Sequence, residues 1–148
     1  MSQRNVDIVR EYFEIVNDGD FSQAMRYYSD DVELVATDEV FLEAGTFTGK
    51  DAVGLWFGNW FRAFQRGYRF DLEEIRQVGE AVFVLARHQG RGKASGAEVR
   101  MTTGYLIRVA GDQIGKIELF PDRRSALEAG GLPEQDAHGE ESSSPLGS

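Results

Sequence analysis

The sequence predicts one α+β domain in which helices cover one face of an antiparallel sheet. Apolar residues recur at helical spacing through residues 3–17, 21–28 and 50–65. From Tyr68 onward the apolar period falls from about 3.6 to about 2 residues, and glycine-containing turns separate the alternating segments. Short links between consecutive strands are typical of an antiparallel meander. Because the helices precede the strands, this order favours an α+β domain with helices on one face of a curved sheet.

The first two helices are predicted from apolar stripes on either side of a short turn. One stripe of residues 3–17 consists of Val6, Val9, Phe13 and Val16. The segment Asn17-Asp18-Gly19-Asp20 ends this helix, and Asp20 is placed to N-cap the next one. The buried face of the second helix is expected to hold Phe21, Ala24, Met25 and Tyr28. Neither helix is long enough to be stable alone, so both must pack on the rest of the domain.

A short hairpin and a third helix follow. Ser29-Asp30-Asp31 is expected to end the second helix, and residues 32–36 alternate as a strand for which residues 41–44 are the expected partner. Thr48-Gly49-Lys50-Asp51 opens the third helix, which is expected to run through about Gln65. Its apolar residues surround much of the circumference, which predicts a helix enclosed on two sides: Val53, Trp56, Phe57, Trp60, Phe61 and Phe64.

The second half of the chain reads as four strands and a short helix. The strands are expected at about 68–78, 81–91, 97–109 and 113–120, with turns at Gly79-Glu80, Gly90 to Gly96, and Gly111. The last helix is expected to start near Asp122 and to end at Gly130-Gly131.

Composition excludes several classes of protein. The chain has 148 residues, no cysteine and two histidines, so disulfides, thiolate chemistry and a zinc site built on several histidines are not expected. A net charge of −9 without a clustered basic face argues against nucleic-acid binding. No apolar run reaches membrane-spanning length, so a cytoplasmic protein is the expectation. Residues 133–148 are acidic and polar and are expected to be a disordered tail.

Four segments carry a resemblance to a known family: VREYFEIVNDGDF at 9–21, YYSDDVEL at 27–34, TFTGKDAVGLWF at 46–57, and GKIELFPDRRSALEAGGL at 115–132. In this order and spacing they resemble the nuclear transport factor 2-like (NTF2-like) superfamily, and within it the SnoaL-like polyketide cyclases and ketosteroid isomerases. The resemblance implies one domain over residues 1–132, with three N-terminal helices packed in the concave face of a cone-shaped sheet. It also implies a deep apolar pocket and a homodimer formed through the outer sheet face.

Strand alternation assigns residues to the expected pocket wall. On the strands this wall is expected to hold Ala36, Asp38, Val84, Ala86, His88, Met101, Thr103, Tyr105, Glu118 and Phe120. The helices are expected to add Tyr12, Val16, Phe57 and Trp60. A mostly apolar lining with a few polar groups is typical of a small-molecule site.

The resemblance implies two kinds of chemistry, each with an incomplete residue set. Ketosteroid isomerases use a carboxylate base and two oxyanion donors. Tyr12 falls at the tyrosine donor position, whereas Ala36 falls at the base position, with Asp38 two residues further on, and Thr103 falls at the second donor position. In the related epoxide hydrolases Glu118 matches one carboxylate, and the arginine and the second carboxylate fall near Ala86 and His88.

The residues therefore leave two functions open. In the first, the protein binds a small, largely apolar molecule and catalyses cofactor-free acid-base chemistry such as isomerisation, cyclisation, hydration, dehydration or epoxide hydrolysis. Glu118, His88 and Asp38 would then handle protons and Tyr12 would donate a hydrogen bond, with Glu118 orienting His88 and raising its pKa. In the second, the same fold is a non-catalytic ligand-binding or dimerisation module. An open cavity between Glu118 and His88 would favour the first, and a filled cone the second.

Overall fold

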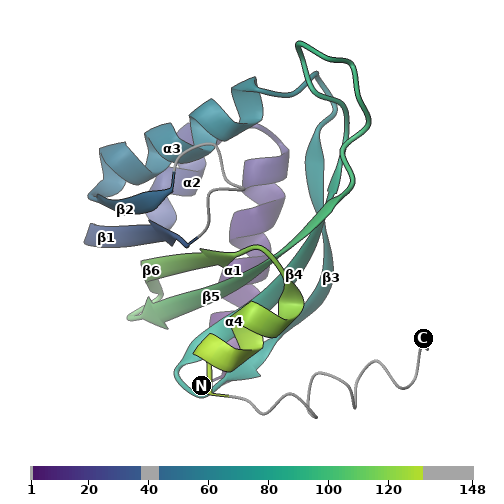
Figure 1. Ribbon diagram of the computed structural model, residues 1–148. Helices are drawn as coiled ribbons and strands as arrows, with labels where there is room; N and C mark the ends of the chain where they lie inside the picture. Colours follow the sequence, from purple (N-terminus) through teal and green to yellow (C-terminus); the bar gives the residue numbers. More distant parts are fainter. Residues whose placement is uncertain (1, 38–43, 132–148) are drawn as a thin grey trace.

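Helices lie on both sides of a curved sheet in the computed structural model, which describes residues 2–37 and 44–131 (Figure 1). The six strands that it describes run in the order β2-β1-β6-β5-β4-β3. In chain order the elements are α1 (Ser2–Asn17), α2 (Phe21–Ala24), the 3-10 turn η1 (Met25–Tyr27), β1 (Tyr28–Ala36), β2 (Gly45–Thr48), α3 (Lys50–Arg62), β3 (Arg69–Val78), β4 (Ala81–Gln89), β5 (Met101–Ala110), β6 (Gln113–Phe120) and α4 (Arg123–Ala129). The α+β prediction is confirmed, but the expectation that all helices cover one face is wrong for α4, which packs on the opposite face.

The start of the chain agrees with the prediction for α1 but not for the segment after it. The apolar stripe of α1 is buried, and the Asp20 carboxylate accepts a hydrogen bond from the Gln23 amide at 3.1 Å, as an N-cap does. The expected second helix ends at Ala24, and β1 begins at Tyr28, four residues before the predicted strand. The reason is non-local, since Tyr28 pairs with Ile114 of β6 in a parallel ladder.

The strand that pairs with β1 in a hairpin lies later than predicted. Residues 45–48 form β2 and pair antiparallel with β1, whereas Ala44 precedes the strand and residues 41–43 lie outside the described residues. Next, α3 ends at Arg62, three residues before the predicted end, because the backbone then turns to the loop after β4. There the Gln65 amide donates to the Arg91 carbonyl at 2.8 Å.

The four-stranded meander is confirmed, with antiparallel pairs β3–β4, β4–β5 and β5–β6. Gly111 and Asp112 connect β5 to β6 with φ of 59° and 64°. Two successive residues with positive φ are what a type I′ hairpin turn requires, and glycine adopts this geometry without a steric penalty.

The two faces of the sheet bury separate apolar clusters. The larger lies between the sheet and α1 and α3, and the smaller lies under α4 with Phe83, Leu106, Phe120 and Leu127 among its members. Gly104 permits this close approach of α4, because a Cβ there would lie 2.7 Å from the Ala126 Cβ. Figure 1 shows α4 and α1 on opposite sides of the strands.

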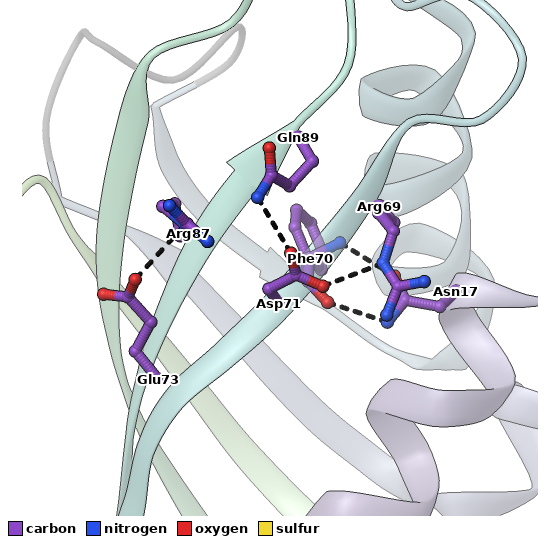
Figure 2. Close-up of polar contacts among 7 residues, drawn as sticks. All are labelled: Asn17, Arg69, Phe70, Asp71, Glu73, Arg87 and Gln89. Atoms are coloured by element: carbon purple, nitrogen blue, oxygen red, sulfur yellow. Dashed lines mark hydrogen bonds and ion pairs between the residues drawn. The ribbon is translucent and has the colours of Figure 1, made fainter.

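The edge strand β3 is capped by a side chain from α1 (Figure 2). The Asn17 amide nitrogen donates to the Phe70 carbonyl, and the Phe70 amide donates to the Asn17 side-chain oxygen, both at 2.8 Å. These two bonds satisfy backbone groups that an edge strand would otherwise leave open. Beside them Asp71 accepts from Arg69 at 2.8 Å and from Gln89 at 2.9 Å. Figure 2 also shows the Arg87–Glu73 ion pair of 3.2 Å, on the neighbouring part of the sheet.

No helix in the described part of the chain is both long enough and apolar enough to span a membrane.

Candidate functional site

Most of the predicted pocket residues share the concave face of the sheet or the helix surfaces against it. The residues that belong to the larger apolar cluster are Tyr12, Val16, Ala36, Phe57, Trp60, Val84, Ala86 and Tyr105. Met101 packs against this cluster, and His88 and Thr103 are buried with it. The faces that alternation assigned to β4 and β5 are therefore correct.

In the part of the chain that the structure describes, aromatic rings fill this interior. Tyr12, Tyr28, Tyr105, Phe13, Phe57 and Phe70 are all nearly inaccessible to solvent. Edge-to-face contacts connect Tyr12 to Phe13 at 5.4 Å between centroids and Phe13 to Tyr105 at 5.2 Å. Such pairs stabilise by about 0.5–1.5 kcal/mol each beyond their burial. The interior of the cone is thus a packed core where the structure describes it.

A chain of hydrogen bonds crosses this apolar interior. The indole nitrogen of Trp60 donates to the Tyr68 hydroxyl oxygen at 2.6 Å, and this hydroxyl lies in a short hydrogen bond to Nδ1 of His88. On the other side of the ring, Nε2 of His88 lies 2.9 Å from the Thr103 hydroxyl oxygen. All the groups are satisfied when Tyr68 donates to Nδ1 and the Nε2 proton is donated to Thr103.

Burial sets the protonation of this chain. It lowers the pKa of His88 to about 4, so the imidazole is neutral near neutral pH. Burial also raises the pKa of the Tyr68 hydroxyl far above its ordinary value, so Tyr68 keeps the proton that it donates. Nε2 of a neutral His88 then carries the remaining ring proton, and the chain has no net charge.

Tyr12, predicted as a hydrogen-bond donor, pairs with another tyrosine. The hydroxyl oxygens of Tyr12 and Tyr28 lie 2.5 Å apart, and both side chains are buried. Burial, as the largest cause, raises the pKa of both hydroxyls. One hydrogen lies between the two oxygens, so the pair retains a second hydroxyl hydrogen for another acceptor.

Glu118 and Phe120 lie on the opposite face from the one predicted. Tyr105 pairs with Leu119, and Leu106 pairs with Glu118, so Glu118 shares the outer face with Leu106. The cause is a β-bulge: Val109 pairs with Ile114 but Arg108 pairs with Lys116, which leaves Gly115 as the extra residue. One extra residue moves every later side chain of the strand to the other face.

The prediction that Glu118 orients His88 as a general base is therefore wrong. The sheet separates the two side chains, with Phe120 in the outer cluster and His88 in the interior. The pKa of His88 is lowered by burial and is not raised by a carboxylate. Asp38 lies outside the described residues, so its predicted role stays a prediction. No group of three or more His, Cys, Asp or Glu side chains placed to hold a metal ion occurs within residues 2–37 and 44–131.

A surface hollow of about 550 Å³ lies between the C-terminal ends of α1 and α3. Four aromatic side chains in its lining form an aromatic floor: Phe21 of α2, Phe61 of α3, and Phe64 and Tyr68 from the turn between α3 and β3. A second hollow of about 360 Å³ shares Asn17, Asp18, Gly67 and Tyr68 with it. Since the Tyr68 hydroxyl bonds to His88, this floor residue links the hollow to the buried chain.

Sequence reasoning did not single out Tyr68. Its ring stacks on Phe64, with centroids 4.1 Å apart, and meets Phe61 edge-on at 5.1 Å. The signal was available in the aromatic spacing of FRAFQRGYRF at 61–70, where rings recur across the boundary between helix and strand.

Comparison with known proteins agrees with this geometry. The SnoaL-like domain family matches residues 9–117, and no curated relative matches the chain. A Catenulispora acidiphila protein with a ketosteroid isomerase-like fold, solved in complex with trimethylamine, is 17% identical, with a TM-score of 0.67 and coverage of 85% of this chain and 93% of that one. A proposed polyketide cyclase from Sinorhizobium meliloti is 23% identical, with a TM-score of 0.61 and coverage of 76% and 93%. TerC, co-crystallised with polyporic acid, is 15% identical, with a TM-score of 0.69 and coverage of 86% and 98%.

At these identities the solved structures show the fold alone. They share the NTF2-like, ketosteroid isomerase-like cone, in which helices pack in the concave face of the sheet. The family match covers most of the described chain, from the middle of α1 to β6. Sequence match and fold together show that this chain belongs to the SnoaL-like domain family.

Proposed function

We propose that this SnoaL-like domain binds a small, largely apolar molecule against the aromatic floor of the hollow between α1 and α3, without a cofactor. The proposal rests on the position of Tyr68, which lines the hollow and forms a hydrogen bond with the buried His88. The volume of about 550 Å³ lies within the range of about 300–1,000 Å³ usual for small-molecule sites.

The packing of the interior favours binding over acid-base chemistry. Glu118 faces away from the cone, and His88 is neutral with both ring nitrogens engaged by Tyr68 and Thr103. A ligand ring that packs against Phe21, Phe61 or Phe64 would gain about 0.5–1.5 kcal/mol for each ring contact beyond the area that it buries. The Trp60–Tyr68–His88–Thr103 chain holds the Tyr68 ring in place, so the floor is organised before the ligand arrives.

Small molecules bound to proteins of this fold support the proposal. TerC was co-crystallised with polyporic acid, and the Catenulispora acidiphila protein was solved in complex with trimethylamine. These molecules belong to those proteins. They indicate that the fold accommodates ligands of different chemistry, and this chain's own residues must define its ligand.

Cofactor-free isomerisation or cyclisation is the second candidate, and the Tyr12–Tyr28 pair favours it. This buried pair retains one hydroxyl hydrogen that could stabilise an oxyanion, as tyrosine donors do in isomerases. The predicted base for such chemistry is Asp38. Turnover of a candidate substrate that survives both Tyr12→Phe and Asp38→Asn would contradict this candidate.

A variant that fills the hollow tests the binding proposal. Gly58 lines the hollow, and a Cβ there would meet only the flexible Arg62 side chain, at 3.5 Å and beyond. We expect native mass spectrometry of the purified protein to show a bound molecule, and Gly58→Leu to lose it. Leu55→Ala is the matched control, because Leu55 is an exposed α3 residue outside the lining of the hollow. Retention in Gly58→Leu, or no binding of any small apolar molecule to the wild type, would refute the proposal.

We also propose a homodimer through the part of the outer sheet face that α4 leaves open. This open part carries the half-buried apolar side chain of Val35, with Glu118 next to it. Light scattering should give twice the chain mass for the wild type and a smaller mass for Val35→Arg. A monomeric wild type would contradict the dimer and leave the binding proposal intact.

A further inference from the structure

Cationic side chains surround the aromatic hollow of this acidic protein. The chain has a net charge of −9, yet the lining of the hollow contains Arg62, Arg66 and Lys93 and one carboxylate, Asp18. The three cations come from three places: the last turn of α3, the turn that follows it, and the loop after β4. A local excess of positive charge in a hollow attracts anions even when the whole protein is negative.

Backbone hydrogen bonds hold these three segments together. The Lys93 amide donates to the Ala63 carbonyl at 2.9 Å, and the Gln65 amide donates to the Arg91 carbonyl at 2.8 Å. Phe64 and Gly92 add an isolated antiparallel bridge between the same segments. These bonds fix the backbone positions from which the three cationic side chains extend.

No carboxylate within the described ranges neutralises these cations, although most other Arg and Lys side chains there are paired. Ion pairs engage Arg4, Lys50, Arg69, Arg76, Arg87, Arg100, Arg108, Lys116 and Arg123. In contrast, Arg62 donates to the neutral side-chain oxygen of Asn59, and neither Arg66 nor Lys93 forms an ion pair with any residue of 2–37 or 44–131. Their charges remain available to a ligand.

We propose that the ligand of this hollow is a flat, apolar small molecule with an anionic group, of the aromatic carboxylate or phenolate class. This inference rests on the proposed function and specifies its ligand. The ring system would pack against the half-buried rings of Phe21, Phe61 and Phe64, and the anion would lie against Arg66 and Lys93. Arg62 lines the same hollow and adds to its positive charge. Arginine suits this role because its guanidinium binds a carboxylate through two parallel hydrogen bonds.

A pair of probes of the same shape separates the charge from the apolar contact. The probes are 2-naphthoate and uncharged 2-naphthamide, titrated by calorimetry. We expect the wild type to bind naphthoate about tenfold more tightly than naphthamide at low salt, which corresponds to two partly exposed charge contacts. The advantage should shrink at about 0.5 M salt, where exposed charges are screened.

Charge-neutralising variants locate the effect. The double variant Arg66→Gln/Lys93→Gln should lose the preference for naphthoate and keep its affinity for naphthamide. Arg108→Gln is the control, since Arg108 pairs with Ala81 at the far end of β4 from His88. Equal binding of both probes to the wild type, or an equal loss in Arg108→Gln, would overturn this inference alone. Binding of neither probe would overturn both this inference and the binding proposal.

Discussion

Acid should weaken the fold through His88 in a pH range set by its buried position. The side chain is 2% exposed, and Trp60, Tyr68 and Phe70 surround the ring, with Phe70 at 4.8 Å between centroids. Its hydrogen-bond partners, Tyr68 and Thr103, are neutral, so neither of them compensates a charge on the imidazole.

The sign and size follow from the two pKa values. Burial lowers the pKa of His88 to about 4 in the folded protein, against 6.5 as the ordinary value. As the pH falls below about 6.5 the unfolded chain binds a proton that the folded protein does not, so the free energy of unfolding decreases. The loss is complete near pH 4 and amounts to about 3 kcal/mol, because each pKa unit corresponds to about 1.4 kcal/mol. Above about pH 6.5 this contribution is fully present.

Urea denaturation followed by tryptophan fluorescence measures this loss, since Trp56 and Trp60 are buried in the core. The comparison is between the wild type and His88→Gln, which retains a donor and an acceptor but does not titrate. Carboxylates and the second histidine, His138, are common to both proteins, so their contributions cancel. Between about pH 7 and pH 4 the wild type should lose about 3 kcal/mol more than the variant. Parallel curves would refute the buried, uncharged environment assigned to His88.

Three further substitutions test the packing and the faces of the sheet. Gly104→Ala should cost about 1–3 kcal/mol because its Cβ would lie 2.7 Å from that of Ala126, and Ala126→Gly in the same chain should recover part of the loss in urea denaturation. Asn17→Ala should cost about 1–3 kcal/mol and speed hydrogen exchange at the Phe70 amide, since it removes both the acceptor of that amide and the donor to the Phe70 carbonyl; unchanged exchange would contradict the edge-strand cap. Glu118→Gln should leave small-molecule binding unchanged, because the side chain lies on the outer face, and a loss of binding would place Glu118 at the site.

Local signals predicted most of the fold. The apolar stripe of α1, the alternation of β4 and the start of α4 near Asp122 each depend on neighbours in the chain, and these elements lie close to where they were expected. The start of β1 was wrong because its first pair, Tyr28 with Ile114, joins residues far apart in sequence. Helical spacing in residues 21–28 gave no warning of that parallel ladder.

The inward-facing residues were predicted correctly on β4 and β5 and wrongly on β6. Unbroken alternation placed His88 and Thr103 correctly, but it also placed Glu118 inside, and the bulge at Gly115 reverses that face. A lone glycine within a strand and the three-residue spacing of Ile114 and Ile117 were signs of the bulge. The cluster of Arg62, Arg66 and Lys93 around the hollow could not be predicted. Backbone pairing between the turn after α3 and the loop after β4 brings these residues together, and the two segments are far apart in sequence.

The most direct test of the account is a crystal structure of the protein with the molecule that it retains on purification. The account predicts a ligand packed against Phe21, Phe61 and Phe64, with an anionic group facing Arg66 and Lys93. A ligand bound against Glu118 on the outer face, with the hollow empty, would contradict it.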